Sequence, residues 1–220
     1  RIFEAATLSA KLGKDIGSPW INEMAPIMSS WDSATRVLIN AVEAKNSYTR
    51  GHTERVTLLS AFMAVELGLS SEECDRVCRG AILHDIGKIG IPDEILNKEA
   101  PLTRAEFEVI RLHPVIGDEI LQNVPELSHV RPIVRSHHEK LDGTGYPDRL
   151  AGDEIDLGTR LVTVADIYDA LRSLRPYRDP LPHAEAMRIL WEEADQGKLD
   201  PKVVSSLADT LVREGASGAA

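Results

Sequence analysis

The stretch from residue 84 to residue 93, His-Asp-Ile-Gly-Lys-Ile-Gly-Ile-Pro-Asp, combines side chains that can hold a metal ion and an anion. The imidazole of His84 offers one lone pair, and the carboxylate of Asp85 offers two oxygens, enough to bridge two ions. Lys88 lies about one helical turn beyond His84, so we expect its ammonium group to face the same space and to suit an anionic substrate. An isolated His-Asp pair is more often a helix cap or a local hydrogen bond, so the assignment depends on what other segments bring to it.

Other candidate ligands lie where predicted helices end or meet loops. With the first pair, the set is His52, His84, Asp85, His113, His137, His138 and Asp166. Imidazole and carboxylate without thiolate suit iron, manganese or zinc rather than a structural zinc knuckle. The set is too large for one ion and fits two, and a carboxylate-bridged pair of ions can activate water for an in-line displacement at phosphorus. Any one of these histidines alone is more often a core or capping residue. We assign His129 and His183 to the surface.

Two capping boxes mark where helices are predicted to begin. Ser70 is followed three residues later by Glu73, and Thr103 by Glu106, so each pair can satisfy the first free backbone N–H groups of a helix. The first of these helices is predicted to run into His84. The apolar stripe of the second is predicted to consist of Phe107, Ile110 and Leu112, with the helix ending at His113-Pro114.

The predicted fold class is all-α, because strand signals are nearly absent and no internal repeat is visible. Further helices are predicted at residues 32–44, 53–67, 93–96, 116–124, 130–136, 184–195 and 201–213, and residues 161–170 are a strongly apolar segment that contains Asp166. We therefore expect a multi-helix bundle of roughly eight or more helices joined by short loops, with the metal site between helices.

Composition describes an ordinary globular protein. The chain has 220 residues and a mass of 24.2 kDa, with 43% hydrophobic and 27% charged residues. A net charge of −10 argues against a nucleic acid polymer as partner, although a local cationic pocket for a small anion remains compatible with it. No apolar run reaches the roughly 18 residues that a membrane span needs. Cys74 and Cys78 lie four residues apart on one predicted helix, so we expect buried free thiols in a reducing, cytoplasmic setting.

The chain is predicted to divide into three parts. Residues 1–31 are interpreted as a helical or linker segment from an upstream signalling region, or as a segment that pairs with a second subunit in a homodimer. Residues 32–214 are expected to form the catalytic domain, and residues 215–220 a disordered tail. Because the chain begins at Arg1 and shows no signal peptide, we expect a fragment of a longer cytoplasmic protein.

Several of these motifs together resemble the HD-GYP domain, a subgroup of the HD phosphohydrolase superfamily. The matching runs follow the family's order and lie within residues 34–213. They are residues 48–56 (Tyr-Thr-Arg-Gly-His-Thr-Glu-Arg-Val), 84–93, 112–117 (Leu-His-Pro-Val-Ile-Gly), 137–139 (His-His-Glu), 142–147 (Asp-Gly-Thr-Gly-Tyr-Pro) and 165–171 (Ala-Asp-Ile-Tyr-Asp-Ala-Leu). The fold that this resemblance implies is an HD-type helical bundle.

The resemblance implies a metal-dependent phosphodiesterase that hydrolyses cyclic di-GMP to linear pGpG and in some members on to GMP. It assigns the metal ligands to two ions, the first held by His52, His84, Asp85 and Asp166, and the second by His113, His137 and His138, with Asp85 bridging. Iron or manganese is expected first, with zinc, nickel or cobalt as alternatives. The implied nucleophile is a hydroxide held between the ions, and Lys88 is expected to contact the scissile phosphate and offset its developing charge.

The resemblance also extends to residues beyond the metal ligands. Arg175 and Arg178 stand where the family places basic residues that reach the substrate phosphates, and arginine suits such contacts. Some relatives have a metal-binding Glu at the position of Tyr48, and a phenol is a poor ligand unless deprotonated, so we predict two ions rather than three.

The loop after the paired histidines has the residues that give the HD-GYP group its name. Gly143 and Gly145 permit tight backbone geometry before Tyr146 and Pro147. Tyr146 is interpreted as lining the substrate entrance or as docking a partner such as a diguanylate cyclase domain. A plain turn with a packed tyrosine is an equally good interpretation.

Two other functions stay open from the sequence. One is a different HD-superfamily enzyme, either a nucleotide phosphohydrolase or a di-iron oxygenase, and the 142–147 loop and the two arginines argue against it. The other is a non-catalytic module that binds cyclic di-GMP or a partner protein. The complete ligand set together with Lys88 argues against that module, because a degenerate site should have lost some of these residues.

Overall fold

The structure is a computed structural model that describes residues 42, 45, 51–174 and 179–216. Within these residues there are helices, no strand, and one isolated antiparallel bridge between Asp142 and Ala151. The all-α prediction is therefore confirmed. The described residues do not include the predicted segment 1–31, Tyr48, Arg175, Arg178 or residues 217–220 of the predicted tail.

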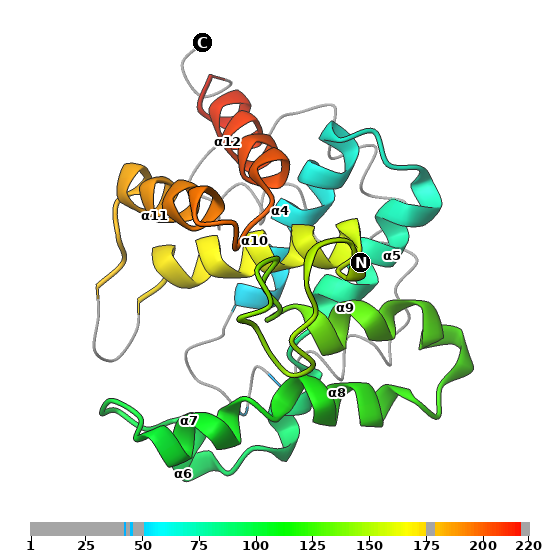
Figure 1. Cartoon of the computed structure of the whole chain (residues 1–220), viewed down its shortest axis with the longest axis vertical. Helices are drawn as coiled ribbons and strands as arrows, with labels where there is room; N and C mark the ends of the chain where they lie inside the picture. The colour runs from blue at the N-terminus through cyan, green and yellow to red at the C-terminus, as the bar shows by residue number, and fades with distance from the viewer. Residues whose placement is uncertain (1–41, 43–44, 46–50, 175–178, 217–220) are drawn as a thin grey trace.

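Nine α-helices are present in the described residues, and they keep the labels of Figure 1. They are α4 (His52–Glu66), α5 (Ser71–Leu83), α6 (Asp93–Leu96), α7 (Arg104–Ile110), α8 (His113–Leu121), α9 (Arg131–Ser136), α10 (Leu157–Arg172), α11 (His183–Asp195) and α12 (Pro201–Ala216). Three short 3-10 helices join them: η1 (Ile86–Gly90), η2 (Pro125–Val130) and η3 (Gly152–Glu154). Helix α12 continues two residues past the predicted domain boundary at 214.

Local sequence signals place several of these helices as predicted. Both capping boxes form: the side chain of Ser70 accepts from the backbone N–H of Glu73 at the start of α5, and that of Thr103 accepts from Glu106 at the start of α7. Gly68 follows the end of α4 with a φ of 75°, a left-handed conformation in which glycine meets little steric cost. Cap replacement by alanine would cost about 1 kcal/mol at either helix start.

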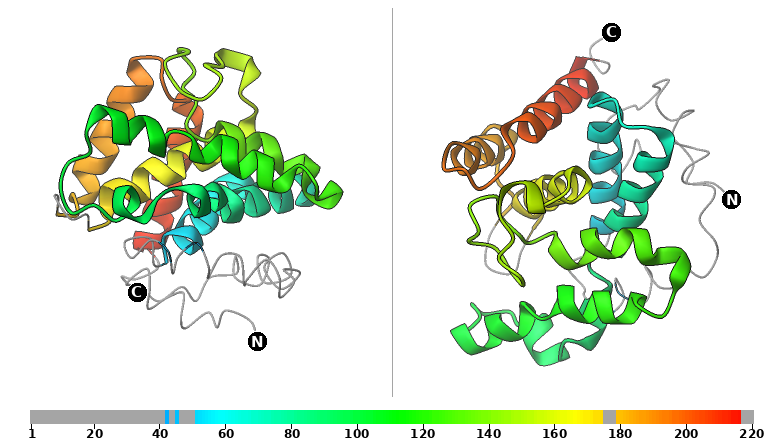
Figure 2. Two further views of the ribbon diagram at one scale, coloured as in Figure 1. Left: turned by 90° about the horizontal axis from the view of Figure 1, so that it is seen from below. Right: turned by 45° about the vertical axis from the view of Figure 1, so that its right-hand side comes forward.

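Helix α10 lies at the centre of the molecule and contacts α4, α5, α9, α11 and α12 (Figures 1 and 2). Its buried residues include Leu161, Val162 and Val164, which pack with Met63 of α4 and Leu190 of α11 in one apolar cluster. Burial of each such side chain stabilises the fold by roughly 1.5–3 kcal/mol. Because the core surrounds α10, any polar residue on this helix is held rigidly, which includes Asp166.

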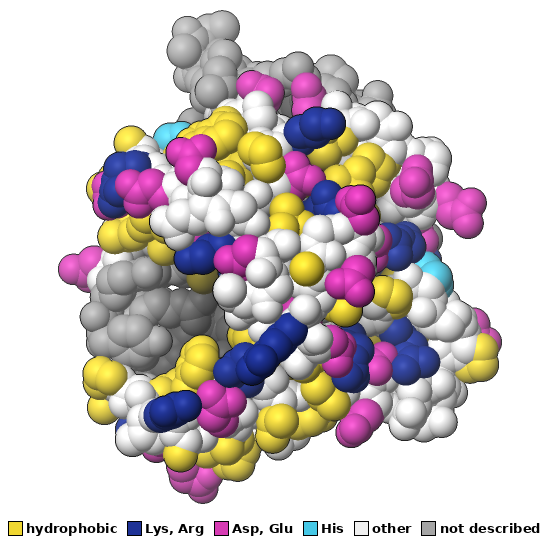
Figure 3. Space-filling model, viewed as in Figure 1, with side chains coloured by type: hydrophobic (Ala, Val, Ile, Leu, Met, Phe, Trp, Pro, Cys, Tyr) yellow, Lys and Arg dark blue, Asp and Glu magenta, His cyan; other side chains and the backbone are white. Residues whose placement is uncertain are grey.

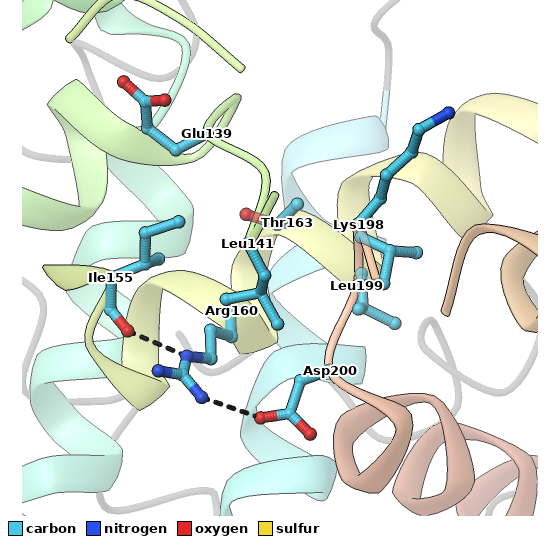
Figure 4. Close-up of a pocket in the computed structure, with 9 residues that line it drawn as sticks. Glu139, Leu141, Ile155, Arg160, Thr163, Lys198, Leu199 and Asp200 are labelled. Atoms are coloured by element: carbon cyan, nitrogen blue, oxygen red, sulfur yellow. Dashed lines mark hydrogen bonds and ion pairs between the residues drawn. The ribbon is translucent and has the colours of Figure 1, made fainter. Parts of the chain in front are cut away.

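An ion pair connects the N-terminal end of α10 to the residue that precedes α12. Arg160 donates from Nε to the carbonyl oxygen of Ile155 at 2.8 Å, and from Nη1 to Oδ2 of Asp200 at 2.9 Å (Figure 4). These bonds hold the segment before α10 against the start of α12. Glu139 lines the same small pocket, but its carboxylate turns away from the ion pair.

Two neighbouring helices are confirmed with shifted bounds. The helix that begins after Thr103 ends at Ile110, before the predicted end at His113-Pro114, and the next helix, α8, begins at His113 instead of at residue 116. The apolar stripe predicted for the first of them is not buried, since Phe107 is 47% and Leu112 is 51% exposed. The reason is position: α6 and α7 form a corner at the edge of the molecule (Figure 1), where no other described element covers that face. Periodicity shows which residues share a face but not whether another element packs on it.

Both cysteines are buried and free, as predicted. In the part of the chain that the structure describes, no helix combines the length and the apolar character of a membrane span.

Candidate metal centre

The predicted metal ligands converge from five helices at one place. His52 is the first residue of α4, His84 and Asp85 follow α5, His113 is the first residue of α8, His137 and His138 follow α9, and Asp166 lies within α10. Two groups of potential ligand atoms each lie within 4.8 Å of one another: His52, His84 and Asp85 form the first, and His113, His137 and His138 the second. The histidines lie at helix ends, where the chain changes direction, and this lets helices from different parts of the chain meet at one place.

Close backbone packing brings the two groups near each other. A methyl group on Gly87 would overlap the backbone of His113, so only glycine lets η1 lie directly against the start of α8. This contact places His113 beside the residues that follow α5. The Nε2 atom of His113 is consequently 3.4 Å from Oδ1 of Asp85.

Three imidazoles are oriented by their own backbone. His84, His113 and His137 each donate from Nδ1 to the carbonyl oxygen three residues earlier, at 2.6, 2.7 and 2.9 Å respectively. Each Nε2 atom is then left with a lone pair, and a backbone acceptor on Nδ1 is the usual partner of a metal-binding histidine. Burial lowers the pKa of His113 to about 4 and that of His137 well below its usual value, so both are neutral near pH 7.

Among the described residues, the lone pairs of these imidazoles have no suitable hydrogen-bond donor. Nε2 of His84 is buried and lacks a hydrogen-bond partner there. Nε2 of His113 and Nε2 of His137 face each other at 3.2 Å, and two acceptors cannot bond to each other. Two nitrogen lone pairs at that separation suit two ligands of one ion, since metal–nitrogen bonds are about 2.1 Å long. The residues present therefore fit a bound metal ion.

Asp85 lies between the two groups. Its Oδ2 atom is 3.4 Å from Nε2 of His84 and 3.7 Å from Nε2 of His52, whereas its Oδ1 atom faces His113. Lys88 also reaches Oδ2, at 2.5 Å from Nζ. Burial alone would raise the pKa of Asp85, but Lys88 and His84 hold it well below its usual range, so the carboxylate is ionised.

The first group is completed by Asp166, whose Oδ1 atom is 3.3 Å from Nε2 of His52. The other nitrogen of His52 is bound by a residue that the sequence analysis did not identify. Nδ1 of His52 lies 2.7 Å from Oδ2 of Asp169, which is 3% exposed. Burial would lower the pKa of His52, but the two carboxylates raise it to about 9 in the metal-free protein.

Asp169 is itself held by a cation. Arg55 donates from Nε to Oδ1 at 2.5 Å and from Nη2 to Oδ2 at 3.0 Å, and Ser173 adds a hydrogen bond at 3.2 Å. A carboxylate behind a metal-binding histidine fixes its ring orientation and tautomer. The sequence carried a signal for both residues: Arg55 lies three residues after His52, and Asp169 three after Asp166, so each shares a helix face with a ligand.

Glu139 is a third residue that the sequence analysis missed. It is 2% exposed, and its Oε1 atom accepts from the backbone N–H groups of Asp148 and Arg149 at 2.6 and 3.0 Å. Glu139 directly follows His138. The run 137–139 therefore supplies two predicted metal ligands and also anchors the loop at 142–151. A methyl group on Gly145 would overlap the backbone at Glu139, so the loop fits only with glycine there.

This anchored loop brings Tyr146 to the centre. The backbone N–H of Tyr146 donates to the carbonyl oxygen of His138 at 3.2 Å, and the two rings stack with centroids 4.8 Å apart. Burial and the nearby carboxylates of Asp166 and Asp85 raise the pKa of Tyr146 far above its usual value, so its hydroxyl is neutral. Gly143 has a φ of 77°, and the peptide bond between Tyr146 and Pro147 is cis. Tyr146 therefore lies beside the predicted ligands.

Of the predicted site residues, the structure brings together all seven ligands, Lys88 and Tyr146. Gly145 packs against the backbone at Glu139, and Gly143 and Pro147 belong to the same loop without a contact to a ligand among those given for the described residues. The two predicted phosphate-binding arginines and Tyr48 lie outside the described residues. His129 and His183 are exposed, and His183 contacts the hydroxyl of Tyr168 at 3.0 Å.

Comparisons with known proteins agree with this arrangement. The HD domain family matches residues 36–203. The "cyclic di-GMP phosphodiesterase" of Thermotoga maritima is 45% identical over 167 residues, which cover 74% of this chain and 45% of that protein. The "3'3'-cGAMP-specific phosphodiesterase 3" of Vibrio cholerae is 41% identical over 170 residues, which cover 77% and 37%.

A solved structure shows the same fold. The HDG"Y"P protein Bd1817 of Bdellovibrio bacteriovorus superposes with a TM-score of 0.62 at 26% identity, over 73% of this chain and 51% of that one. The chain spans less than half the length of the two curated relatives named above.

Proposed function

The chain belongs to the HD domain family, in its HD-GYP group, and we propose that it is a metal-dependent phosphodiesterase that hydrolyses cyclic di-GMP. The observation that carries this proposal is the position of Asp85, whose two oxygens face different groups of histidines. A carboxylate that faces two sets of ligands suits two divalent ions, and we propose iron or manganese for them. When bound, such a pair supplies Lewis acidity and an activated water for displacement at phosphorus.

The protein's own residues have distinct parts in this proposal. His52, His84 and Asp166 serve the first ion, the other three histidines serve the second, and Asp85 serves both. The Lys88 side chain is 17% exposed, and its ammonium lies beside Asp85, where it can donate to a non-bridging oxygen of the scissile phosphate. Tyr146 stacks on His138 and would border the bound substrate.

The remaining roles are proposals, most of them for residues that the structure does not describe. We propose that Arg175 and Arg178 bind substrate phosphates, that residues 1–31 link the domain 32–214 to an upstream sensor or receiver domain, and that the protein works in the cytoplasm. Docking of a diguanylate cyclase domain on the 142–147 loop is the corresponding proposal for a partner.

A second candidate substrate is 3'3'-cGAMP. Relatives from Vibrio cholerae that are 41%, 36% and 38% identical to this chain have names that specify it. Both molecules are cyclic dinucleotides with two phosphodiesters and differ in one base. Because the metal centre acts on phosphorus, it cannot discriminate between them, and the choice rests on contacts to the bases.

A product assay tests the proposal. The protein is purified without air, supplied with Fe²⁺ or Mn²⁺, and given cyclic di-GMP and 3'3'-cGAMP separately and in competition, with products separated by chromatography. We expect pGpG or GMP from cyclic di-GMP, and loss of product in Asp85→Asn. Retention of both ions without hydrolysis of either substrate would show that this is a binding module instead.

A further inference from the structure

Arg111 is a cation beside the metal centre that the proposed function leaves without a role. It follows the last residue of α7, two residues before His113. Its guanidinium carbon lies 4.5 Å from the centroid of the Tyr146 ring, which in turn stacks on His138. We propose that Arg111 binds the second phosphodiester of the cyclic dinucleotide, the one that is not being cleaved. This inference rests on the proposed function and deepens it.

The backbone at Arg111 is fixed relative to the metal ligands. The carbonyl oxygen of Ile110 accepts from Nδ1 of His113 at 2.7 Å, so the end of α7 is tied to a predicted ligand. The two ring distances place the guanidinium within about 9 Å of the His138 ring. A group held at this range can reach a substrate bound at the ions without a rearrangement of the fold.

The guanidinium of Arg111 is held in place by a hydrogen bond, but only part of its donor capacity is occupied. Its Nη1 atom donates to the carboxylate of Glu108 at 3.2 and 3.4 Å, whereas Nε and Nη2 have no hydrogen-bond partner among the described residues. The side chain is 28% exposed, so a ligand can approach it from solvent. Contact with the aromatic ring restricts the side chain and lowers the entropy lost on binding.

The phosphate of the substrate that is not cleaved carries a negative charge, and a nearby cation would offset it. A cyclic dinucleotide carries one negative charge on each of two phosphodiesters, on opposite sides of one ring. Asp85 and Asp166 are ionised in the centre, and the bound ions and Lys88 can offset charge only at the scissile phosphate. The other phosphate points away from them and gains from a separate fork of N–H donors.

Arg111 directly follows α7. The face seen in Figure 1 is hollowed beside α7, as the space-filling view shows (Figure 3). Basic and acidic side chains alternate on that face and form no extended basic surface (Figure 3). A small dianionic ligand with a single dedicated arginine matches this pattern better than a polymer would.

The test compares two substrates in Arg111→Gln, Arg111→Lys and wild-type protein. Cyclic di-GMP has a second phosphate, whereas bis(p-nitrophenyl) phosphate has only the one that is cleaved. We expect Arg111→Gln to raise KM for cyclic di-GMP about tenfold or more, with kcat changed less, because a hydrogen-bonded ion pair is lost. Its kcat/KM for bis(p-nitrophenyl) phosphate should stay near the wild-type value, and Arg111→Lys should lie between.

Arg104→Gln is the matched control, since it removes an exposed arginine from the other end of α7. Unchanged kinetics of Arg111→Gln on cyclic di-GMP would overturn the inference. Equal losses on both substrates would also overturn it, because they would mean that Arg111 only positions Tyr146 and the metal ligands.

Calorimetric binding of cyclic di-GMP to the metal-loaded protein separates this inference from the proposed function. If the wild type binds without cleaving, the phosphodiesterase proposal fails, and about tenfold weaker binding by Arg111→Gln still supports the role of Arg111. If the wild type neither binds nor cleaves, both fail.

Discussion

Replacement of Asp169 by Asn should weaken metal binding, although Asp169 is not itself one of the predicted metal ligands. The carboxylate accepts four hydrogen bonds, from Nδ1 of His52, from two nitrogens of Arg55 and from Ser173. An amide keeps the shape but carries no charge, and one of its two terminal atoms can only donate. The orientation and basicity of His52 should therefore both decline, while the other ligands keep their places.

The magnitude follows from the role of a carboxylate behind a histidine ligand. Its loss typically costs tenfold to a hundredfold in metal affinity, which is about 1.4–2.7 kcal/mol. Stability should fall as well, because the ion pair between Arg55 and Asp169 is lost. Arg55 is 26% exposed, so solvent compensates in part, and we expect a loss of about 1–2 kcal/mol rather than the larger cost of a fully buried charge.

The assay is metal content after equilibrium dialysis against graded chelator, measured by mass spectrometry, with thermal unfolding of the metal-free and metal-loaded forms. Asp195→Asn removes an exposed carboxylate in α11 and serves as the control. We expect Asp169→Asn to lose affinity for one of two ions. Wild-type affinity at both would refute the reasoning that Asp169 orients His52.

Further predictions concern the loop, the thiols and acid. Gly145→Ala should raise KM for the cyclic dinucleotide roughly tenfold, because the added methyl group overlaps the backbone at Glu139 and displaces Tyr146; unchanged kinetics would show that the loop position is irrelevant. Cys74 and Cys78 should not react with a thiol reagent at pH 8 until the protein is unfolded, because both are buried and burial raises the pKa of the Cys78 thiol to about 12. The metal-free protein should lose stability as pH falls from about 6.5 to 4, because burial lowers the pKa of His113 to about 4 in the folded state and the unfolded chain then binds the proton more readily. Urea unfolding across that range checks this, and a rise in stability toward pH 4 would contradict it.

Local features could be predicted from the sequence because short-range physics decides them. The capping boxes at Ser70 and Thr103 involve residues three apart, and both form as expected. The orientations of His84 and His113 are also local, since each bonds a carbonyl three residues earlier. The chemical types of the ligands likewise predicted a metal site that acts on phosphorus, before any geometry was known.

The contacts that complete the site depend on segments far apart in the chain. Asp169 meets His52 across 117 residues, and Arg111 meets Tyr146 only because Glu139 anchors the loop. The sequence likewise did not determine whether another element covers the apolar face of α7, and Phe107 on that face is exposed. Spacing along a chain determines which residues share a helix face, but it holds no information on which other face will pack against it. That choice is made by the whole core around α10, where apolar burial sets the position of each helix and thereby the distances between the side chains at their ends.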